Sequence, residues 1–442
     1  MPGDKSICHR AAILAAMCKG ETTLVNFNPG DEFKTTLKCL SQFGVSSELV
    51  ENDRLVIKSP GLHDLKQPET VVDLESSSVT ARLMLGLAAT LPFTVRFDGA
   101  PKLRAQPMRR VIEPLQKMGA TIESDNFRLP IEITGGNLQA IQYVMPISTS
   151  QVKGAVFIAG ITASGVTELI ERFSSRDHLE RLINHLGIKF SKEKYKPAPP
   201  KIADEFERRL KQKTKSVLDD PRGDLFKIPG GQLPAAGALV EVPGDISSAS
   251  MFVAAATLIK GSEVAIDDIS LNPTRRGFLE ILTKMRANIK YEIESIKSNE
   301  PRGRIIAKYG PLKGRRIVGE MIPTIIDELP IMAVIATQSQ GTTVIRDAFD
   351  LRHKEVDRIK VVVSNLRKMG ARIGELEDGM AIDGGNELEG TEIVTYGDHR
   401  MAMAFAIAGL VAKGETVIKD AECVATSYPS FWDDLESIVE YK

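Results

Sequence analysis

Residues 1–17, MPGDKSICHRAAILAAM, combine a turn, charged side chains and an apolar run. Pro2 and Gly3 are typical of a turn. The segment that begins at Ser6 has the composition of a helix, so Lys5 should lie at a helix N-terminus. The unpaired N–H groups and partial positive charge of that end favour an anion. Because a lysine there opposes the helix dipole, a ligand site is one interpretation and an ordinary capped helix with a solvated lysine is the other.

A helix of small residues followed by a β-rich run occurs six times along the chain. These helices are apolar nearly all round, which predicts that they are buried. The copies are RAAILAAMCKGETTLVNF, ARLMLGLAATLPFTVRF, VKGAVFIAGITASGVTELI, ASMFVAAATLIKGSEVAI, LPIMAVIATQSQGTTVI and RMAMAFAIAGLVAKGETVI. We expect a glycine at the left-handed position that ends a helix in five of them, at Gly20, Gly165, Gly261, Gly341 and Gly414.

A second motif follows each copy at a steady lag. SQFGV, QKMGA, NHLGI, TKMRA and RKMGA each end an amphipathic helix before a β-type run, and WDDLESIVEY is a sixth candidate helix. Each unit is therefore predicted to contain a strand, a buried helix, a strand, an amphipathic helix and a strand. The period of roughly 70 to 95 residues is larger than that of common solenoid repeats. Six units predict two similar three-unit domains, 6–242 and 243–442, with a hinge near 1–5 and 240–244.

One segment fits no unit. Residues 192–228 are rich in charge and proline, and we interpret them as an insertion in the third unit. Within it, ADEFERRLKQKTKSV could form one exposed helix.

Composition excludes several classes of protein. A chain of 442 residues suggests two or three domains, and a net charge of −1 implies no nucleic-acid partner. The four cysteines form no CxxC pair, and the histidines are scattered, so we expect free thiols and neither a metal nor a cofactor. No apolar run is long enough to span a bilayer, and the N-terminus lacks a signal pattern. We expect a cytoplasmic α/β protein, monomeric and without a membrane partner.

Charged motifs stand at the N-terminal ends of the otherwise apolar helices. If the helices are buried, these charges meet at one shared surface, most simply an interdomain cleft that binds an anion. Burial shifts pKa values and strengthens charge pairs, as acid–base chemistry requires. Each motif taken singly could instead be a solvated face or a structural ion pair. The motifs are GDKSICHR, STSQVKG, SSRDHLER, DELPIM, LRHKEVDRIK and YGDHRMAM.

The chain resembles a known enzyme family over most of its length. PGDKSICHRAAILAA, PLQKMGA, SQVKGAVFIAG, RDHLERLI, VPGDISSAS, IDELPIMAV, LRHKEVDRI and DHRMAMAFAIAGL are similar to motifs of the 5-enolpyruvylshikimate-3-phosphate synthase family (3-phosphoshikimate 1-carboxyvinyltransferase). The resemblance implies a two-domain inside-out α/β barrel of six βαβαββ repeats that closes on its substrates. It also implies transfer of the enolpyruvyl group of phosphoenolpyruvate to the 5-hydroxyl of shikimate 3-phosphate, in the shikimate pathway of aromatic amino acid biosynthesis.

The same resemblance implies roles for individual residues. Asp327 would be the general base on the 5-hydroxyl, Glu355 would exchange a proton with the enolpyruvyl methylene, and Lys5 and Lys354 would complete the catalytic set. Arg358 and Arg400 would hold the phosphoenolpyruvate carboxylate. The remaining substrate-binding residues would be Ser6, Arg10, Arg82, Thr149, Ser150, Gln151, Ser175, Arg176 and Asp350.

The phosphoenolpyruvate half departs from the family pattern. Ser78 stands at the position of a family glycine, Gln106 replaces an arginine, and Thr426 replaces a lysine. Two cations that would pair with the phosphate are therefore missing. Hydrogen bonds to charged groups are worth about 1.5–3 kcal/mol each, so their loss would weaken binding by roughly 3–6 kcal/mol. Nearby cations could compensate, namely Lys102, Arg104, Arg109 and Arg110.

These departures leave three functions open. The first is an ordinary synthase with a rebuilt phosphoenolpyruvate pocket. The second is a paralogue that eliminates water or phosphate from a shikimate-type substrate, with Asp327 or Glu355 as base. The third is a binding protein that closes on its ligand without turnover. The family strand before Pro-Gly-Asp-Lys-Ser is also missing, so we expect either a short start or an altered hinge.

Overall fold

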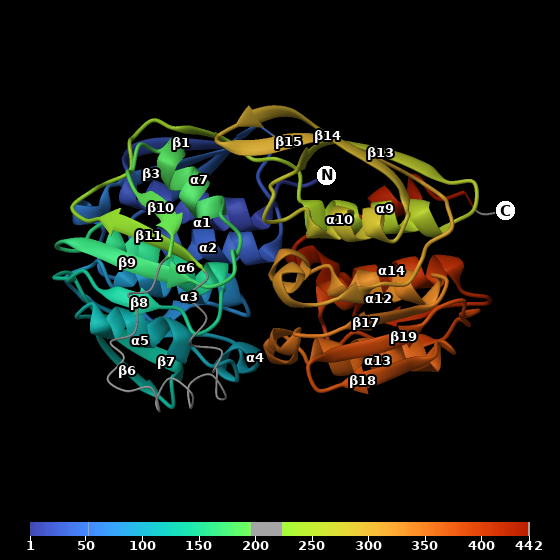
Figure 1. Cartoon of the computed structure of the whole chain (residues 1–442). Helices are drawn as coiled ribbons and strands as arrows, with labels where there is room; N and C mark the ends of the chain where they lie inside the picture. Colours follow the sequence, from blue (N-terminus) through green and yellow to red (C-terminus); the bar gives the residue numbers. More distant parts are fainter. Residues whose placement is uncertain (52, 196–222, 441–442) are drawn as a thin grey trace, which may run out of the picture.

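The chain folds around two hydrophobic cores. The computed structural model describes residues 1–51, 53–195 and 223–440. One core contains buried residues from Ile7 to Val242, and the other contains buried residues from Ile246 to Leu435. The first half of the chain, blue to green in Figure 1, lies beside the second half, yellow to red. We propose 6–242 and 243–442 as the limits of two domains.

The first domain is built from three units that share one order of elements. Each has a buried helix, a strand, an outer helix and a hairpin. Their elements are α1 (Lys5–Met17), β1 (Lys19–Val25), α2 (Asp31–Ser41), β2 (Ser46–Glu51) and β3 (Arg54–Pro60); β4 (Val72–Asp73), α3 (Ser78–Ala88), β5 (Thr94–Asp98), α4 (Pro101–Arg104), α5 (Arg109–Lys117), β6 (Thr121–Asp125) and β7 (Arg128–Thr134); and β8 (Gln142–Val144), α6 (Ser150–Gly160), β9 (Val166–Glu171), α7 (His178–His185), β10 (Ser191–Lys194), β11 (Asp224–Pro229) and β12 (Leu239–Glu241).

The first two units of the second domain repeat this order, and the last unit has no hairpin among the described residues. Its last helix runs from Phe431 to Glu436 and so covers only the first part of the predicted WDDLESIVEY helix. The elements are α9 (Ile246–Leu258), β13 (Glu263–Ser270), α10 (Gly277–Lys284), β14 (Asn288–Lys297) and β15 (Glu300–Lys308); β16 (Arg316–Ile317), α11 (Ile322–Ile325), α12 (Leu329–Thr337), β17 (Thr342–Ile345), α13 (Arg358–Lys368), β18 (Ile373–Leu376) and β19 (Gly379–Asp383); and β20 (Glu392–Val394), α14 (His399–Val411), β21 (Val417–Lys419) and α15 (Phe431–Glu436).

Among the described residues, four of the six sheets share one topology. In β4-β5-β7-β6 and β16-β17-β19-β18, a short strand pairs parallel with the second strand, which then pairs antiparallel with the hairpin. The first unit takes its short parallel strand from β12, at the far end of the same domain. Within the described part of the chain, β13-β15-β14 has three strands and β20-β21 has two. Recurrence of one topology confirms the repeat that the two sequence motifs predicted.

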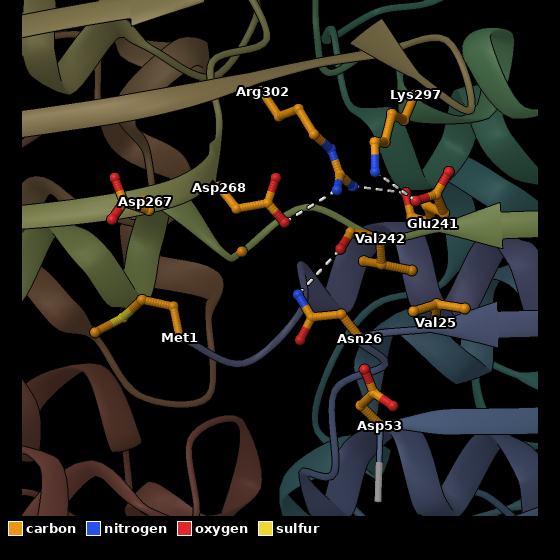
Figure 2. Close-up of a pocket in the computed structure, with 11 residues that line it drawn as sticks. Met1, Val25, Asn26, Asp53, Glu241, Val242, Asp267, Asp268, Lys297 and Arg302 are labelled. Carbon is orange, nitrogen blue, oxygen red and sulfur yellow. Dashed lines mark hydrogen bonds and ion pairs between the residues drawn. The ribbon is translucent and has the colours of Figure 1, made fainter. Parts of the chain in front are cut away.

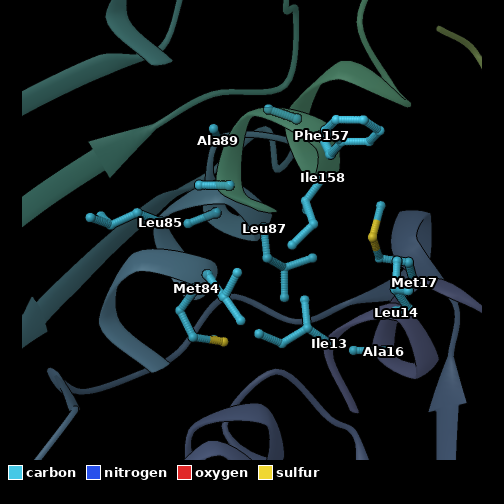
Figure 3. Packing of buried hydrophobic residues seen from close by; sticks show 14 of the residues in the cluster. Ile13, Leu14, Ala16, Met17, Met84, Leu85, Leu87, Ala89, Phe157 and Ile158 are labelled. Carbon is cyan, nitrogen blue, oxygen red and sulfur yellow. The ribbon is translucent and has the colours of Figure 1, made fainter. Parts of the chain in front are cut away.

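The apolar helices form the interior, and the sheets lie outside them. In α1 every residue except Lys5 is buried, and α9 and α14 are buried along most of their length. Figure 3 shows Ile13 of α1 close to Met84 and Leu87 of α3, with Ile158 of α6 next to Leu87. Their burial confirms the prediction made from an all-round apolar composition.

Two Pro-Gly-Asp segments cross between the domains and pair with each other. Gly3 and Gly244 form an antiparallel bridge, and the Asp4 N–H donates to the Pro243 carbonyl at 2.8 Å. The side chain of Asp4 caps α1, while Asp245 caps α9 in the same way. The crossing therefore fixes where the first buried helix of each domain begins.

A hollow of about 390 Å³ lies beside this crossing. Its walls come from both domains, and several of its polar side chains pair with their neighbours (Figure 2). Asn26 donates to the Val242 carbonyl at 3.0 Å, and Arg302 binds the Asp268 carboxylate at 3.0 Å. Arg302 also donates to the Glu241 carbonyl at 2.8 Å, and this contact joins the two domains near the chain crossing.

Two predictions about local structure were wrong. Gly20 and Gly165 have φ values of 115° and 100°, but they lie beyond the helix ends, because Cys18 and Ile161 are the capping residues. The proposed insertion 192–228 also included strand residues, since β10 and β11 form an antiparallel hairpin of the third unit. The helix suggested for ADEFERRLKQKTKSV lies outside the described residues.

Cys8, Cys18 and Cys39 are buried free thiols, and Cys423 is a partly buried one. Burial raises the pKa of Cys39 to about 12. No helix among the described residues is long and apolar enough to cross a membrane.

The outer helices end in a left-handed residue. Gly44, Gly119, Gly187 and Gly370 have positive φ values at this position. In the fourth unit the equivalent residue is Arg286, with φ of 67°. A left-handed conformation costs a residue with a Cβ roughly 1–2 kcal/mol.

We expect Arg286→Gly to stabilise the protein, because glycine adopts this conformation without the Cβ penalty. After the added entropy of the unfolded chain, the gain should be up to about 1 kcal/mol. Lys284→Gly, two residues earlier inside α10, is the matched control and should destabilise by about 0.5–1 kcal/mol. Thermal unfolding of both variants checks this, and a lower melting temperature for Arg286→Gly would contradict it.

Candidate active site

The N-terminal ends of the buried helices from both domains meet at the domain interface. There they form what we call the interdomain ion cluster, in which most charged groups contact a partner of opposite sign. The cluster consists of the cations Lys5, Arg10, Arg82, Arg110, Arg176, Lys354, Arg358 and Arg400 and the carboxylates Glu32, Asp327, Asp350, Glu355 and Asp398. The cations outnumber the carboxylates, which makes the cluster favourable for anionic ligands.

Asp327 lies at the centre of this cluster, just before α12. Arg176 crosses from the first domain to pair with its carboxylate, and Arg358 approaches to 3.4 Å. Arg400 lies 3.7 Å from the same carboxylate. Burial acts to raise the pKa of Asp327, but these three guanidinium groups and the Lys354 ammonium hold it well below its usual range. Without a ligand, Asp327 is therefore ionised and a weak base.

Glu355 and Lys354 lie beside it. The Glu355 carboxylate accepts from Arg358 Nη2 at 2.7 Å. Although burial opposes ionisation, Arg358 and Lys354 lower the pKa of Glu355 to about 2. Burial lowers the pKa of Lys354, an effect that the nearby Asp327 carboxylate partly offsets. A ligand that alters the charges around Glu355 and Lys354 could thus change the protonation state of either group.

Asp398 organises the arginines on the second domain. It is fully buried and accepts from Arg358 Nε at 2.8 Å. It also caps α14, because its other oxygen accepts from the Arg400 backbone N–H at 2.8 Å. One carboxylate therefore orients the side chain of Arg358 and the helix start that carries Arg400.

A second group of polar residues faces the cluster from the first domain. Arg10 donates to the carbonyl oxygens of Ser6 and Ser150, at 2.8 and 3.1 Å. Arg176 donates to the Ser6 hydroxyl at 3.3 Å. The buried Ser175 hydroxyl has no partner among the described residues. Thr149 is the N-cap of α6 but makes no side-chain capping bond, and Gln151 follows in its first turn. Ser6, Arg10 and Ser150 are therefore linked to Arg176, which joins them to Asp327 of the second domain.

Sequence reasoning missed the partners of two lysines. Glu32 pairs with Lys5 at 2.5 Å, and both are largely buried. Lys153 lies under the Ser175 loop, 3.0 Å from Glu171 and 2.6 Å from Glu180. A lysine within the apolar run SQVKGAVFIAG was a usable signal, because a buried lysine requires an acidic partner. The identity of that partner depended on the tertiary fold.

Two of the three departures from the family pattern lie beside α3. Ser78 is the first residue of α3, and its carbonyl accepts from Arg82 Nη1 at 3.0 Å. Gln106 is buried, and its side-chain oxygen accepts from Arg82 Nη2 at 3.3 Å. Thr426, in contrast, ends the short helix Ala421–Thr426 of the second domain.

Comparison with known proteins supports one family throughout. A family model described as EPSP synthase (3-phosphoshikimate 1-carboxyvinyltransferase) matches residues 1–200 and 197–435. A protein from Bacillus cereus named 3-phosphoshikimate 1-carboxyvinyltransferase is 39% identical over 443 residues, which cover 100% of this chain and 96% of that protein. A relative of the same name from Bacillus thuringiensis is also 39% identical over 443 residues, with the same coverage of the two chains.

Solved structures give the same result for the fold. An EPSP synthase structure from Acinetobacter baumannii has a TM-score of 0.81 and 33% sequence identity, covering 99% of this chain and 94% of the other. The enolpyruvyl transferase NikO from Streptomyces tendae has a TM-score of 0.75 at 14% identity, covering 99% and 93%, and shares the fold alone.

Two three-unit domains with buried helices inside, sheets outside and an ion cluster between them define the enolpyruvyl transferase class. The predicted inside-out α/β barrel is thereby confirmed. Within that class, the chain belongs to the EPSP synthase family.

The Lys153 pairs generate a stability prediction. Lys153→Met leaves Glu171 and Glu180 buried without a cation, which should lower the free energy of unfolding by about 3–5 kcal/mol. The control Lys194→Met removes an 80% exposed partner of Asp224, and exposed pairs contribute about 0–1 kcal/mol. Thermal unfolding measures both variants. Equal melting temperatures for the two variants would contradict the prediction that Lys153 stabilises the fold by neutralising Glu171 and Glu180.

Proposed function

We propose that this chain transfers the enolpyruvyl group of phosphoenolpyruvate to the 5-hydroxyl of shikimate 3-phosphate, with release of inorganic phosphate. Full-length similarity to the EPSP synthase family supports the reaction class. The observation that carries the proposal is the pairing of Arg176 with Asp327 across the domain interface. This pair joins Arg176, the residue proposed to bind the substrate phosphate on one domain, to Asp327, the proposed base on the other.

Shikimate 3-phosphate would bind mainly to the first domain. Ser175 and Arg176 would hold its phosphate together with Thr149, Ser150 and Gln151. When the phosphate takes Arg176, Asp327 loses its first-domain cation, and the pKa of the Asp327 carboxylate rises toward its usual range. The substrate would thus convert a neutralised carboxylate into a base at the moment its own hydroxyl arrives.

Phosphoenolpyruvate would place its carboxylate against Arg358 and Arg400. Competition for Arg358 would raise the pKa of Glu355, which could then donate a proton to the methylene carbon as the 5-oxygen attacks the adjacent carbon. Return of that proton to Glu355 would accompany loss of phosphate from the tetrahedral intermediate. Lys5 and Lys354 would stabilise the negative charge that develops on the transferred group and the departing phosphate.

Neither alternative function gains support from these observations. The curated relatives are named as transferases, and an enzyme that only eliminates has no need for a second set of carboxylate-binding arginines. The substrates are small molecules, and a monomeric state and a cytoplasmic location stay predictions from the sequence.

The reaction predicts a simple requirement for both substrates. Phosphorus NMR should show inorganic phosphate appearing when shikimate 3-phosphate and phosphoenolpyruvate are supplied together. Omission of phosphoenolpyruvate is the control. Release from shikimate 3-phosphate alone, or no release with both, would refute the proposal.

A second prediction concerns pH. Arg176→Gln removes a guanidinium that favours ionised Asp327, so the pKa of that carboxylate rises. Since the base must be ionised, the acidic limb of kcat/KM should move to higher pH. Arg346→Gln, which removes an exposed partner of Asp378, is the control and should leave the limb unchanged. An unshifted acidic limb in Arg176→Gln would contradict the inference that Arg176 lowers the pKa of Asp327.

A further inference from the structure

A buried lysine that the proposed reaction does not use contacts the loop that carries Ser175 and Arg176. Lys153 lies in the first turn of α6 and is 1% exposed. Its Nζ lies 3.0 Å from a carboxylate oxygen of Glu171, 2.6 Å from one of Glu180 and 3.4 Å from the Ser175 carbonyl oxygen. An ammonium group has three N–H donors, so these three oxygens are as many acceptors as it can serve.

The three contacts lie at both ends of the loop and at its middle. Glu171 is the last residue of β9, and Glu180 lies in the first turn of α7. Residues 172–177 connect these two elements, and Ser175 lies between them. The lysine itself belongs to α6, which packs against α3 in the interior of the first domain. One side chain therefore ties the path of the loop to the buried helices.

The second carboxylate at this lysine is not explained by charge balance. Glu171 alone already neutralises Lys153. Burial raises the pKa of the Glu180 carboxyl, an effect that Lys153 only partly offsets, so Glu180 adds a desolvation cost to the fold. It also places a negative charge near Arg10, where a substrate anion would be opposed by it. What Glu180 contributes is a link between the start of α7 and the lysine.

The loop carries two groups that depend on its exact position. The Ser175 hydroxyl is buried and has no hydrogen-bond partner among the described residues. Arg176 reaches the Ser6 hydroxyl at 3.3 Å and pairs with Asp327. The backbone between these two side chains begins at the carbonyl group that Lys153 binds. A displacement of about 1 Å in a substrate-binding group can cost as much as a hundredfold in rate.

We propose that Lys153 is a positioning residue for the first-domain substrate. By binding the Ser175 carbonyl and the carboxylate of Glu180, its ammonium group fixes the loop so that the Ser175 hydroxyl and Arg176 face the substrate phosphate before it arrives. Lys153 does not itself touch the substrate. This inference rests on the proposed function, in which Ser175 and Arg176 hold the phosphate of shikimate 3-phosphate.

The first test removes the anchor without leaving a buried charge. Lys153→Met/Glu171→Gln/Glu180→Gln deletes the cation together with both carboxylate charges, so the melting temperature should stay close to that of the wild type. Calorimetry should show binding of shikimate 3-phosphate weakened by about tenfold. The KM for phosphoenolpyruvate, measured at saturating shikimate 3-phosphate, should stay within about twofold. A purely structural role would not separate the two substrates in this way.

A second variant decides the question if the triple variant fails to fold. Glu180→Gln keeps the pair of Lys153 with Glu171 and should weaken binding of shikimate 3-phosphate by about threefold, since one of three attachments is lost. Loss of a negative charge near the site would by itself strengthen binding of an anion, so a weaker affinity reports on the loop. Glu193→Gln on β10, which removes an exposed partner of Lys227, is the matched control and should change neither substrate.

Unchanged affinity for shikimate 3-phosphate in either folded variant, or equal losses for both substrates, overturns the positioning role of Lys153. Failure of the wild-type chain to bind shikimate 3-phosphate, or to release phosphate with both substrates, would instead overturn the proposed function. The two failures are therefore distinguishable.

Discussion

A single buried guanidinium fixes how the two domains meet. Arg275 lies within 4.0 Å of carboxylate oxygens of Asp4, Asp245 and Glu328. Asp4 and Asp245 belong to the two chain crossings and cap the first buried helix of each domain, while Glu328 precedes α12. Without this cation, three carboxylates would be buried with little compensation, at a cost of several kcal/mol. The helix ends that build the site are therefore held in register by one residue outside it.

The same principle of mutual neutralisation governs the site. In the ligand-free protein, nearby arginines keep both Asp327 and Glu355 ionised by lowering their pKa values. Asp327 is then a poor proton acceptor, and Glu355 has no proton to donate. Anionic substrates that compete for those arginines would reverse this. Ground-state ion pairs thus hold the domains together, and their exchange for substrate contacts would supply the pKa changes that proton transfer needs.

Much of this arrangement could be predicted from sequence, and the reason is local. An apolar helix with charges only at its first turn has one buried body and one functional end, so Lys5, Asp327 and Arg400 could be placed together. Lys153 shows the limit of such prediction. The lysine stands out within an apolar stretch of sequence, but only the tertiary fold determines that Glu171 and Glu180 are its partners. The glycines after the buried helices were misplaced because the chain needs further residues to turn into the next strand.

Separation of the apolar helix bodies from their polar first turns has a consequence for how such a chain diversifies. Packing constrains residues such as Ile13 and Phe157, whereas a changed first turn alters ligand contacts with little effect on the interior. Specificity can accordingly change at the N-terminal end of one helix at a time on an unchanged scaffold. The departures from the family pattern at Ser78 and Gln106 are an example of such a local change. For an engineer, the six tips are natural positions for a focused library.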